Sequence, residues 1–400
     1  MKTERKTKHH EKINYEKIFF VNIVTLLMGF STALLTYITS TYFKESLQTE
    51  NISWIYLVSN VILLIFLLNI HRLISTIGKT TLFHLLNIGK ISIFVILILV
   101  NNPFVNVFFL MTFIIFDLLA WVTINMILES FSIDKESGKI YGFNFTLFNL
   151  GFLIAPIIST QLLSRFGFQG VFSLAITTTS IIFLIAFFKL NQIDYRYTKK
   201  ISVKKIFKKV SERKDILNIF FVALSLYFFY SIMTIYTPLY LLDKGLSWSQ
   251  IGIIFTIMLI PFVLIQYPAG LLADKKFGEK EIIFISLIIV AASTIIFCIT
   301  ESTEVMILSL ILFCSRVGAA LVEILQSSYF YKRVDGTDVE LIAFFQTANP
   351  IAYILAPAIS GILLIFFDMK SVFILSTVIS LLTLYPTYKL VDNKSESEIN

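Results

Sequence analysis

The feature that most constrains this chain is a series of about twelve apolar runs, each near the roughly 20 residues that a helix needs to cross a bilayer. Hydrophobic residues make up 56% of the 400 residues, and charged residues only 15%. A soluble core of this size could not bury so much Phe, Ile and Leu. We therefore predict an all-α membrane protein with twelve transmembrane helices, near 18–42, 52–70, 81–100, 104–128, 141–163, 170–190, 216–241, 249–272, 281–300, 305–330, 341–366 and 371–390.

Basic residues predict how the chain is oriented in the bilayer. One long polar stretch, 191–215, is rich in lysine and separates two groups of six apolar runs. We place it on one side of the membrane, together with the tails 1–17 and 391–400 and the other even-numbered loops. Most of the 33 Lys and Arg residues then lie on that side. Because such loops stay in the cytoplasm, we expect both termini in the cytoplasm of a prokaryotic cell with this protein in its inner membrane. The stretch 191–215 suits contact with anionic lipid headgroups better than binding to nucleic acid.

Internal repeats indicate that the two groups of helices arose from one duplicated unit. IFFV occurs at 18–21 and again at 219–222, and LIAPIIS at 153–159 corresponds to ILAPAIS at 354–360. Both matches have the same spacing of 201 residues, 219 minus 18 and 354 minus 153. Each unit has an even number of helices, so the two are expected to be parallel repeats about an axis along the membrane normal. The predicted bundles are residues 18–190 and 216–390.

The loop GLLADKKFGEK at 270–280 resembles the motif G-x-L-A-D-(R/K)-(R/K)-x-G of the major facilitator superfamily of transporters. Glu279 departs from that motif in charge. The first-half counterpart, IHRLISTIGKT at 70–80, keeps Gly78 and Lys79 but has Ile74 in place of the aspartate. The resemblance covers the whole chain and implies that the second-half loop gates the cytoplasmic side, with a plain basic turn as the alternative. The residues concerned are Gly270, Asp274, Lys275, Lys276, Gly278 and Lys280.

Two prolines at repeat-related positions, Pro156 and Pro357, lie inside apolar runs. GFLIAP, which ends at Pro156, resembles a glycine–proline motif of antiporters in the same family, but the glycines that follow it there are absent. We expect both prolines to kink their helices, either as part of the mechanism or simply to shape the bundle. Ser247, in a segment that resembles the family's loop between helices seven and eight, is expected to cap the next helix.

Polar side chains form one stripe on the first predicted helix and another on the seventh. On each helix they recur at steps of mainly three or four residues, which places them on one face. Such stripes either bind neighbouring helices through hydrogen bonds or line a water-filled path. The resemblance implies that helices one, four, seven and ten surround that path. The stripes consist of Asn22, Thr25, Thr32 and Thr36 on the first helix and Tyr227, Tyr230, Ser231 and Thr234 on the seventh.

Charged groups inside the apolar runs are the strongest candidates for a functional site, because each costs about 2.5–3.5 kcal/mol at the centre of a membrane helix. Arg316 and Glu323 lie on one face of the tenth predicted helix, and Asp117 lies on the fourth, followed by Trp121 and Asn125. We expect Arg316 and Asp117 to face each other across a cavity. Arg316 would hold an anionic group or balance an acid, and Asp117 or Glu323 would bind the coupling proton. The alternative is structural pairing of Asp117 with Lys90, and of Arg316 with Glu323 or Glu129.

Together these features predict a secondary transporter of a small organic solute that works by alternating access, for efflux or uptake, with protons as a candidate coupling ion. The nucleotide-binding pattern G-x-x-x-x-G-K-(S/T) does not occur, which argues against direct drive by ATP. Cysteine and histidine positions show no metal-ligand spacing, so we expect no metal, cofactor or catalytic site. The alternatives are a receptor or scaffold that keeps the fold without transport and, less favoured, a membrane enzyme. The resemblance implies a monomer.

Overall fold

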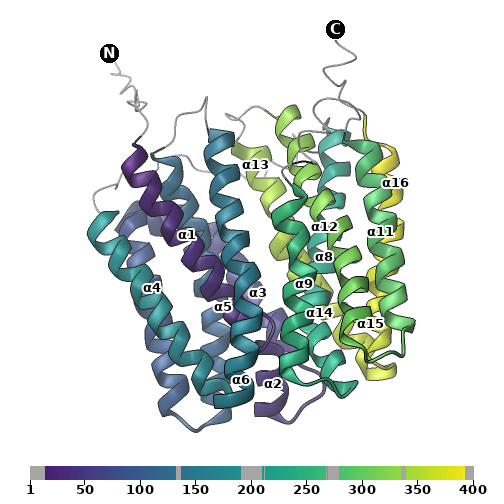
Figure 1. The fold of residues 1–400 in the computed structure, drawn as a ribbon. Coiled ribbons are helices and arrows are strands. Elements are labelled where there is room, and N and C mark those ends of the chain that lie inside the picture. The colour runs from purple at the N-terminus through teal and green to yellow at the C-terminus, as the bar shows by residue number, and fades with distance from the viewer. Residues whose placement is uncertain are drawn as a thin grey trace, which may run out of the picture.

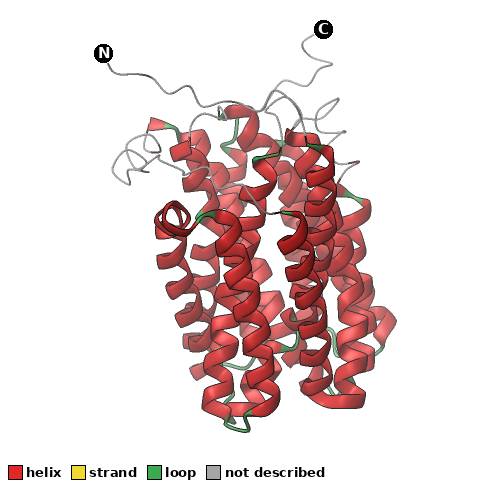
Figure 2. Ribbon diagram, turned by 90° about the vertical axis from the view of Figure 1, so that its left-hand side faces the viewer, coloured by secondary structure: helices red, strands yellow, loops and turns green. Residues whose placement is uncertain are grey.

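The computed structural model describes residues 14–131, 137–190, 210, 212–266, 268, 279–334 and 339–391, and every regular element in these ranges is a helix (Figures 1 and 2). The first half contains α1 (Tyr15–Thr36), α2 (Thr39–Leu47), α3 (Ser53–Ile77), α4 (Lys79–Leu99), α5 (Pro103–Glu129) and α6 (Ser137–Lys189). The second half contains α8 (Lys214–Asp243), α9 (Trp248–Leu264), α11 (Lys280–Ile299), α12 (Val305–Arg333), α13 (Val339–Gln346), α14 (Ala348–Phe366), α15 (Lys370–Leu382) and α16 (Leu384–Tyr388).

The described helices make twelve membrane passes, as the apolar runs predicted. Ten helical segments are long and apolar enough to cross a bilayer. One of them, within α6, is interrupted at Gly167, where the backbone is not helical (φ 64°, ψ −166°), and it therefore crosses twice. The apolar helix α9 supplies the remaining pass. This confirms the all-α membrane class and the twelve helices.

One break within the helices follows the sequence expectation and one does not. The passes predicted separately at 141–163 and 170–190 are two helices, divided at the non-helical Gly167 that lies between the predicted ranges. The first pass, predicted as continuous, ends at Thr36 and resumes at Thr39, so that Tyr37 lies in a break between α1 and α2. A run of apolar and Thr residues does not reveal such a break, because tertiary contacts rather than helix propensity determine it. Pro156 and Pro357 both lie inside continuous helices.

The two halves stand side by side, with α1–α6 coloured from purple to teal and α8–α16 from teal-green to yellow (Figure 1). Each half packs within itself, for example α1 on α6 and α11 on α12. The halves meet where α6 packs on α9 and α3 packs on α14. The start of α1 and the end of α16 lie at the same end of the bundle (Figure 1), here called the terminal face. The other end is called the opposite face.

Two repeat-related contacts close the opposite face. A Cβ atom at Gly252 of α9 would lie 1.9 Å from Oγ1 of Thr160 in α6. The residues 201 positions away make the second contact, in which the Asn51 amide donates a 2.9 Å hydrogen bond to the carbonyl of Gly361. The pairing follows the repeat, since 160 plus 201 is 361 and 51 plus 201 is 252. Close helix approach of this kind depends on small residues.

Further bonds reinforce the closed opposite face. The hydroxyls of Ser53 and Tyr236 lie 2.8 Å apart, and the Lys44 ammonium lies 3.3 Å from the Asp243 carboxylate. Both pairs join the first half to the second. Direct contact between the halves therefore closes this end of the bundle in the described conformation.

Candidate functional site

Asp117 is held by two residues of its own half. Its Oδ1 lies 2.8 Å from Nζ of Lys90 in α4, and its Oδ2 accepts a 2.7 Å hydrogen bond from Thr32 in α1. The Lys90 side chain is completely buried, whereas 13% of the Asp117 side chain is exposed. Pairing with Lys90, the alternative that the sequence left open, is therefore the arrangement that the structure has. Asp117 makes no described ion pair with Arg316.

Arg316 lies in an aromatic setting without an ion-pair partner. The residue is 3% exposed, and its guanidinium carbon lies 5.0 Å from the ring centre of Phe229 and 5.8 Å from that of Tyr230. Its Nε is shielded and has no hydrogen-bond partner. Among the residues that the structure describes, no carboxylate oxygen lies within 4.0 Å of it, so the alternative pairs with Glu323 and Glu129 are not formed.

Glu323 takes part in a hydrogen-bonded network that crosses between the halves. Its carboxylate accepts a 2.7 Å bond from the Gln266 amide and a 3.4 Å bond from the Tyr230 hydroxyl. The carbonyl oxygen of Gln266 in turn accepts a 3.2 Å bond from the amide of Asn149 in α6. A carboxylate in α12 is thus linked through one side chain to the other half of the molecule.

Sequence reasoning missed Gln266 and Asn149. Each is an amide inside an apolar run, where a polar side chain needs a partner, and that was the available signal. A lone amide in a membrane helix fits ordinary contact between helices equally well, so its link to Glu323 could be found only from the three-dimensional arrangement.

The polar stripe on α1 divides into two parts. Asn22 and Thr25 are buried and accept hydrogen bonds of 2.8 and 2.9 Å from the Asn144 amide of α6, so they bind two helices together. Thr32 supports Asp117, and the hydroxyl of Thr36 bonds to the Thr32 carbonyl and stays partly exposed.

The stripe on α8 lies beside Arg316 and Glu323. The rings of Tyr227 and Tyr230 are 6.2 Å apart and partly exposed, as is Thr234, which neighbours Tyr353 of α14. Ser231 is completely buried, and its hydroxyl has no partner. Tyr227, Tyr230 and Thr234 therefore keep part of their surface uncovered, and Ser231 does not.

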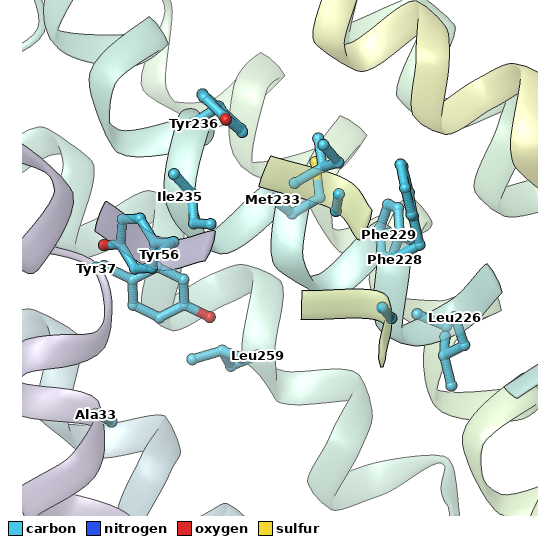
Figure 3. Packing of buried hydrophobic residues seen from close by; sticks show 14 of the residues in the cluster. Ala33, Tyr37, Tyr56, Leu226, Phe228, Phe229, Met233, Ile235, Tyr236 and Leu259 are labelled. Carbon is cyan, nitrogen blue, oxygen red and sulfur yellow. The ribbon is translucent and has the colours of Figure 1, made fainter. Parts of the chain in front are cut away.

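Aromatic side chains form a row from the first half to the second. The Trp121 ring lies 4.3 Å from that of Phe148, and further ring contacts lead through Phe152 to Tyr37. Tyr37, in the break of the first pass, lies 4.5 Å from Phe255 of α9. Figure 3 shows Tyr37 within the buried hydrophobic core, together with residues of α8 such as Phe229 and Met233. Asn125, one helical turn from Trp121, is partly exposed.

The loop motif lies mostly outside the described residues. Of its members only Lys280 is described, at the start of α11, with Nζ 5.2 Å from the ring centre of Tyr388. The adjacent Glu279 is completely buried and accepts bonds from Ser328 (2.9 Å) and Lys332 (2.6 Å) in the last turns of α12.

Glu279 carries a negative charge where the motif has a positive one, and its first-half counterpart, Lys79, shows why. Lys79 bonds directly to the Ser130 hydroxyl and to the Met126 carbonyl at the end of α5. A lysine is favourable at a helix C-terminus, and the same position in the second half meets a lysine already on α12. The opposite charge is therefore required there.

Capping at the start of α9 follows the sequence expectation. The Ser247 hydroxyl accepts a bond from the Gln250 backbone, and the Gln250 side chain accepts one from the Ser247 backbone, which forms a capping box.

Two six-helix halves, with charged and polar groups buried between their helices, give the architecture of a multi-pass membrane protein. Comparison with known proteins supports this class. The Major Facilitator Superfamily model matches residues 21–338 and 249–400. The chain therefore belongs to the Major Facilitator Superfamily, as the sequence motifs indicated.

Solved structures show the same fold. A mutant of the nucleoside transporter NupG is 14% identical with a TM-score of 0.75, covering 94% of this chain and 99% of its own. A bacterial homologue of the human lysosomal transporter Spinster, inward-facing and occupied, is 11% identical with a TM-score of 0.69, covering 93% and 95%. No curated protein sequence matches significantly.

Proposed function

We propose that this protein is a secondary active transporter that moves a small organic solute by rocking its two halves about a site beside Glu323. The observation that carries the proposal is the pair of repeat-related contacts that joins the halves at one end of the bundle. Repeat-related contacts close the opposite face, while partly exposed polar side chains lie at mid-depth. Breaking those contacts on one side and forming their equivalents on the other would expose the same residues to the second compartment.

The terminal face is proposed to lie in the cytoplasm. Basic residues of both tails and of the stretch 191–215 support this orientation, in the inner membrane of a prokaryotic cell and with the protein as a monomer. The described conformation is then closed toward the outside. The second-half loop, from Gly270 to Lys280, is proposed to hold the cytoplasmic side shut in the other state.

Glu323 is proposed to carry the coupling proton. Asp117 already has a cationic partner in Lys90, whereas Glu323 has no cation within ion-pair distance among the described residues. The ionisable groups that face it are Arg316 on its own helix, Tyr227 and Tyr230 on α8, and Tyr353 on α14.

Protonation of Glu323 would alter the link between the halves. An ionised carboxylate can only accept hydrogen bonds, so it orients the Gln266 amide with its nitrogen inward and its oxygen toward Asn149. A protonated carboxyl can also donate, which removes this constraint. Proton binding in the second half would in this way change the contact with the first half.

Glu323→Gln tests the assignment of the proton. In proteoliposomes offered a library of labelled organic solutes, the wild type is expected to accumulate its substrate when a pH gradient is imposed. The variant should lose this accumulation but keep exchange of internal for external substrate, because exchange needs no net proton movement. Asp117→Asn combined with Lys90→Met serves as the matched control and should retain gradient-driven accumulation.

Accumulation by Glu323→Gln at the wild-type level would reject the proton assignment while leaving transport intact. Absence of flux for every solute would instead favour the receptor or scaffold.

A further inference from the structure

We propose that Arg316 binds the anionic group of the transported solute, so that the substrate is an organic acid or phosphate ester with a flat apolar portion. The inference rests on the proposed transport function and gives it a substrate class. It starts from the one cationic side chain at mid-depth that has no counter-ion among the residues that the structure describes.

The distribution of charge at mid-depth leaves Arg316 unbalanced. Lys90 and Asp117 neutralise each other at 2.8 Å. Glu323 directs its carboxylate to Gln266 and Tyr230 and makes no ion pair with Arg316. A charge that is 97% buried is unfavourable unless it is paired. An anionic solute would supply the missing partner.

The chemistry of the guanidinium selects the kind of anion. Its planar array of donors matches two oxygens of a carboxylate or a phosphate at once. The Nε donor of Arg316 has no partner, so it is available to such an oxygen after a small movement of the side chain. A solute with only an amine or an amide would leave this donor unpaired.

The surroundings of Arg316 select the rest of the solute. Phe229 and Tyr230 lie against the guanidinium, and Tyr37 and Tyr353 are within its electrostatic range. Tyr37 comes from the first half and Tyr353 from the second, so both halves contribute an aromatic side chain near this charge. Tyr37 also belongs to the aromatic row that leads to Phe255 and Trp121. These surfaces favour a flat apolar group beside the anion.

The same geometry links the anion to the proton. Glu323 and Arg316 are within electrostatic range of each other. Neutralising Glu323 removes a negative charge that acts on Arg316, which favours binding of an anion there. By linkage, a bound anion favours proton binding at Glu323 to the same extent.

Binding to the purified full-length protein in detergent tests the inference. The probes are phenylacetate, phenyl phosphate and the neutral analogue phenylacetamide, measured by calorimetry at fixed ionic strength. At least one anion should bind the wild type more tightly than phenylacetamide does. Arg316→Gln should weaken the binding of that anion about tenfold or more, as expected for loss of charge-assisted hydrogen bonds. Arg72→Gln, at an exposed arginine far along α3, should leave binding unchanged.

Two further variants keep the test informative. Should Arg316→Gln fail to fold, Arg316→Lys keeps the charge but not the planar donor array, and it should retain weaker anion binding. Glu323→Gln should bind the anion more tightly than the wild type at high pH.

Three results would overturn the inference: equal binding of phenylacetamide, wild-type anion affinity in both Arg316 variants, or no binding of either anion. If any of these results is found and neutral or cationic solutes are still transported, only the substrate class is rejected and the proposed transport function is retained. Absence of flux for every solute would reject both the substrate class and the transport function.

Discussion

Asp117→Asn is expected to destabilise the protein by about 3–5 kcal/mol, because it leaves a completely buried ammonium group at Lys90 without a counter-charge. Lys90→Met should act in the same direction by leaving the Asp117 carboxylate with only the Thr32 hydroxyl. The double variant removes both charges and should recover most of the lost stability, since a neutral pair of similar size has no desolvation penalty.

Apparent melting temperatures of the three variants in detergent measure this coupling. Two strongly shifted single variants and a double variant near the wild type are expected. A double variant as unstable as the sum of the single variants would show that Lys90 and Asp117 act independently. A double variant that folds but loses pH-driven transport would indicate that Asp117, and not Glu323, carries the coupling proton.

Gly252→Ala is expected to open the opposite face. The new Cβ would lie 1.9 Å from Oγ1 of Thr160 and 3.1 Å from its Cβ, so the halves cannot approach as closely there. Overpacking of this kind costs about 1–3 kcal/mol, which would shift the balance between the two conformations by about fivefold to a hundredfold. Transport should fall accordingly, because every cycle passes through this closed state.

Thr160→Ala provides the matched rescue, since it removes the oxygen that Gly252→Ala would meet. The double variant should recover transport, and Thr160→Ala alone should remain active. Spin labels on the two halves near Lys44 and Asp243 would report the separation at this end. An unchanged separation in Gly252→Ala would contradict the role of this contact.

Most of the fold could be predicted from the sequence because its physical cause is local. Runs of apolar residues fix the membrane passes, and the spacing of 201 residues identified two related halves. The same spacing relates the two contacts between the halves, at Gly252 and at Gly361. The break at Gly167 falls between two predicted passes, whereas the break at Tyr37 depends on packing between helices, which composition does not encode.

The candidate site was predictable in its charged members but not in their partners. Intramembrane charge is costly, and this singled out Asp117, Arg316 and Glu323. The spacing of Arg316 and Glu323 on one helix favoured an ion pair as readily as separate roles. Only the fold shows that Gln266 and Tyr230 contact Glu323 and that aromatic rings flank Arg316.

Thiol labelling tests most directly whether solvent reaches the space between the halves. The native Cys298 and Cys314 are replaced by serine, and single cysteines are introduced at Thr36 and Thr234, which are proposed to line that space, and at Ile181 and Ile288, which are exposed on the outer surface. A membrane-impermeant maleimide is applied from either side of oriented vesicles.

The account predicts labelling at Thr36 and Thr234, from the cytoplasmic side in the described conformation and from the other side when Gly252→Ala is added. Ile181 and Ile288, which face lipid, should stay unlabelled. Protection of Thr36 and Thr234 from both sides, in both backgrounds, would contradict the central claim that the halves enclose a solvent-filled site with alternating access.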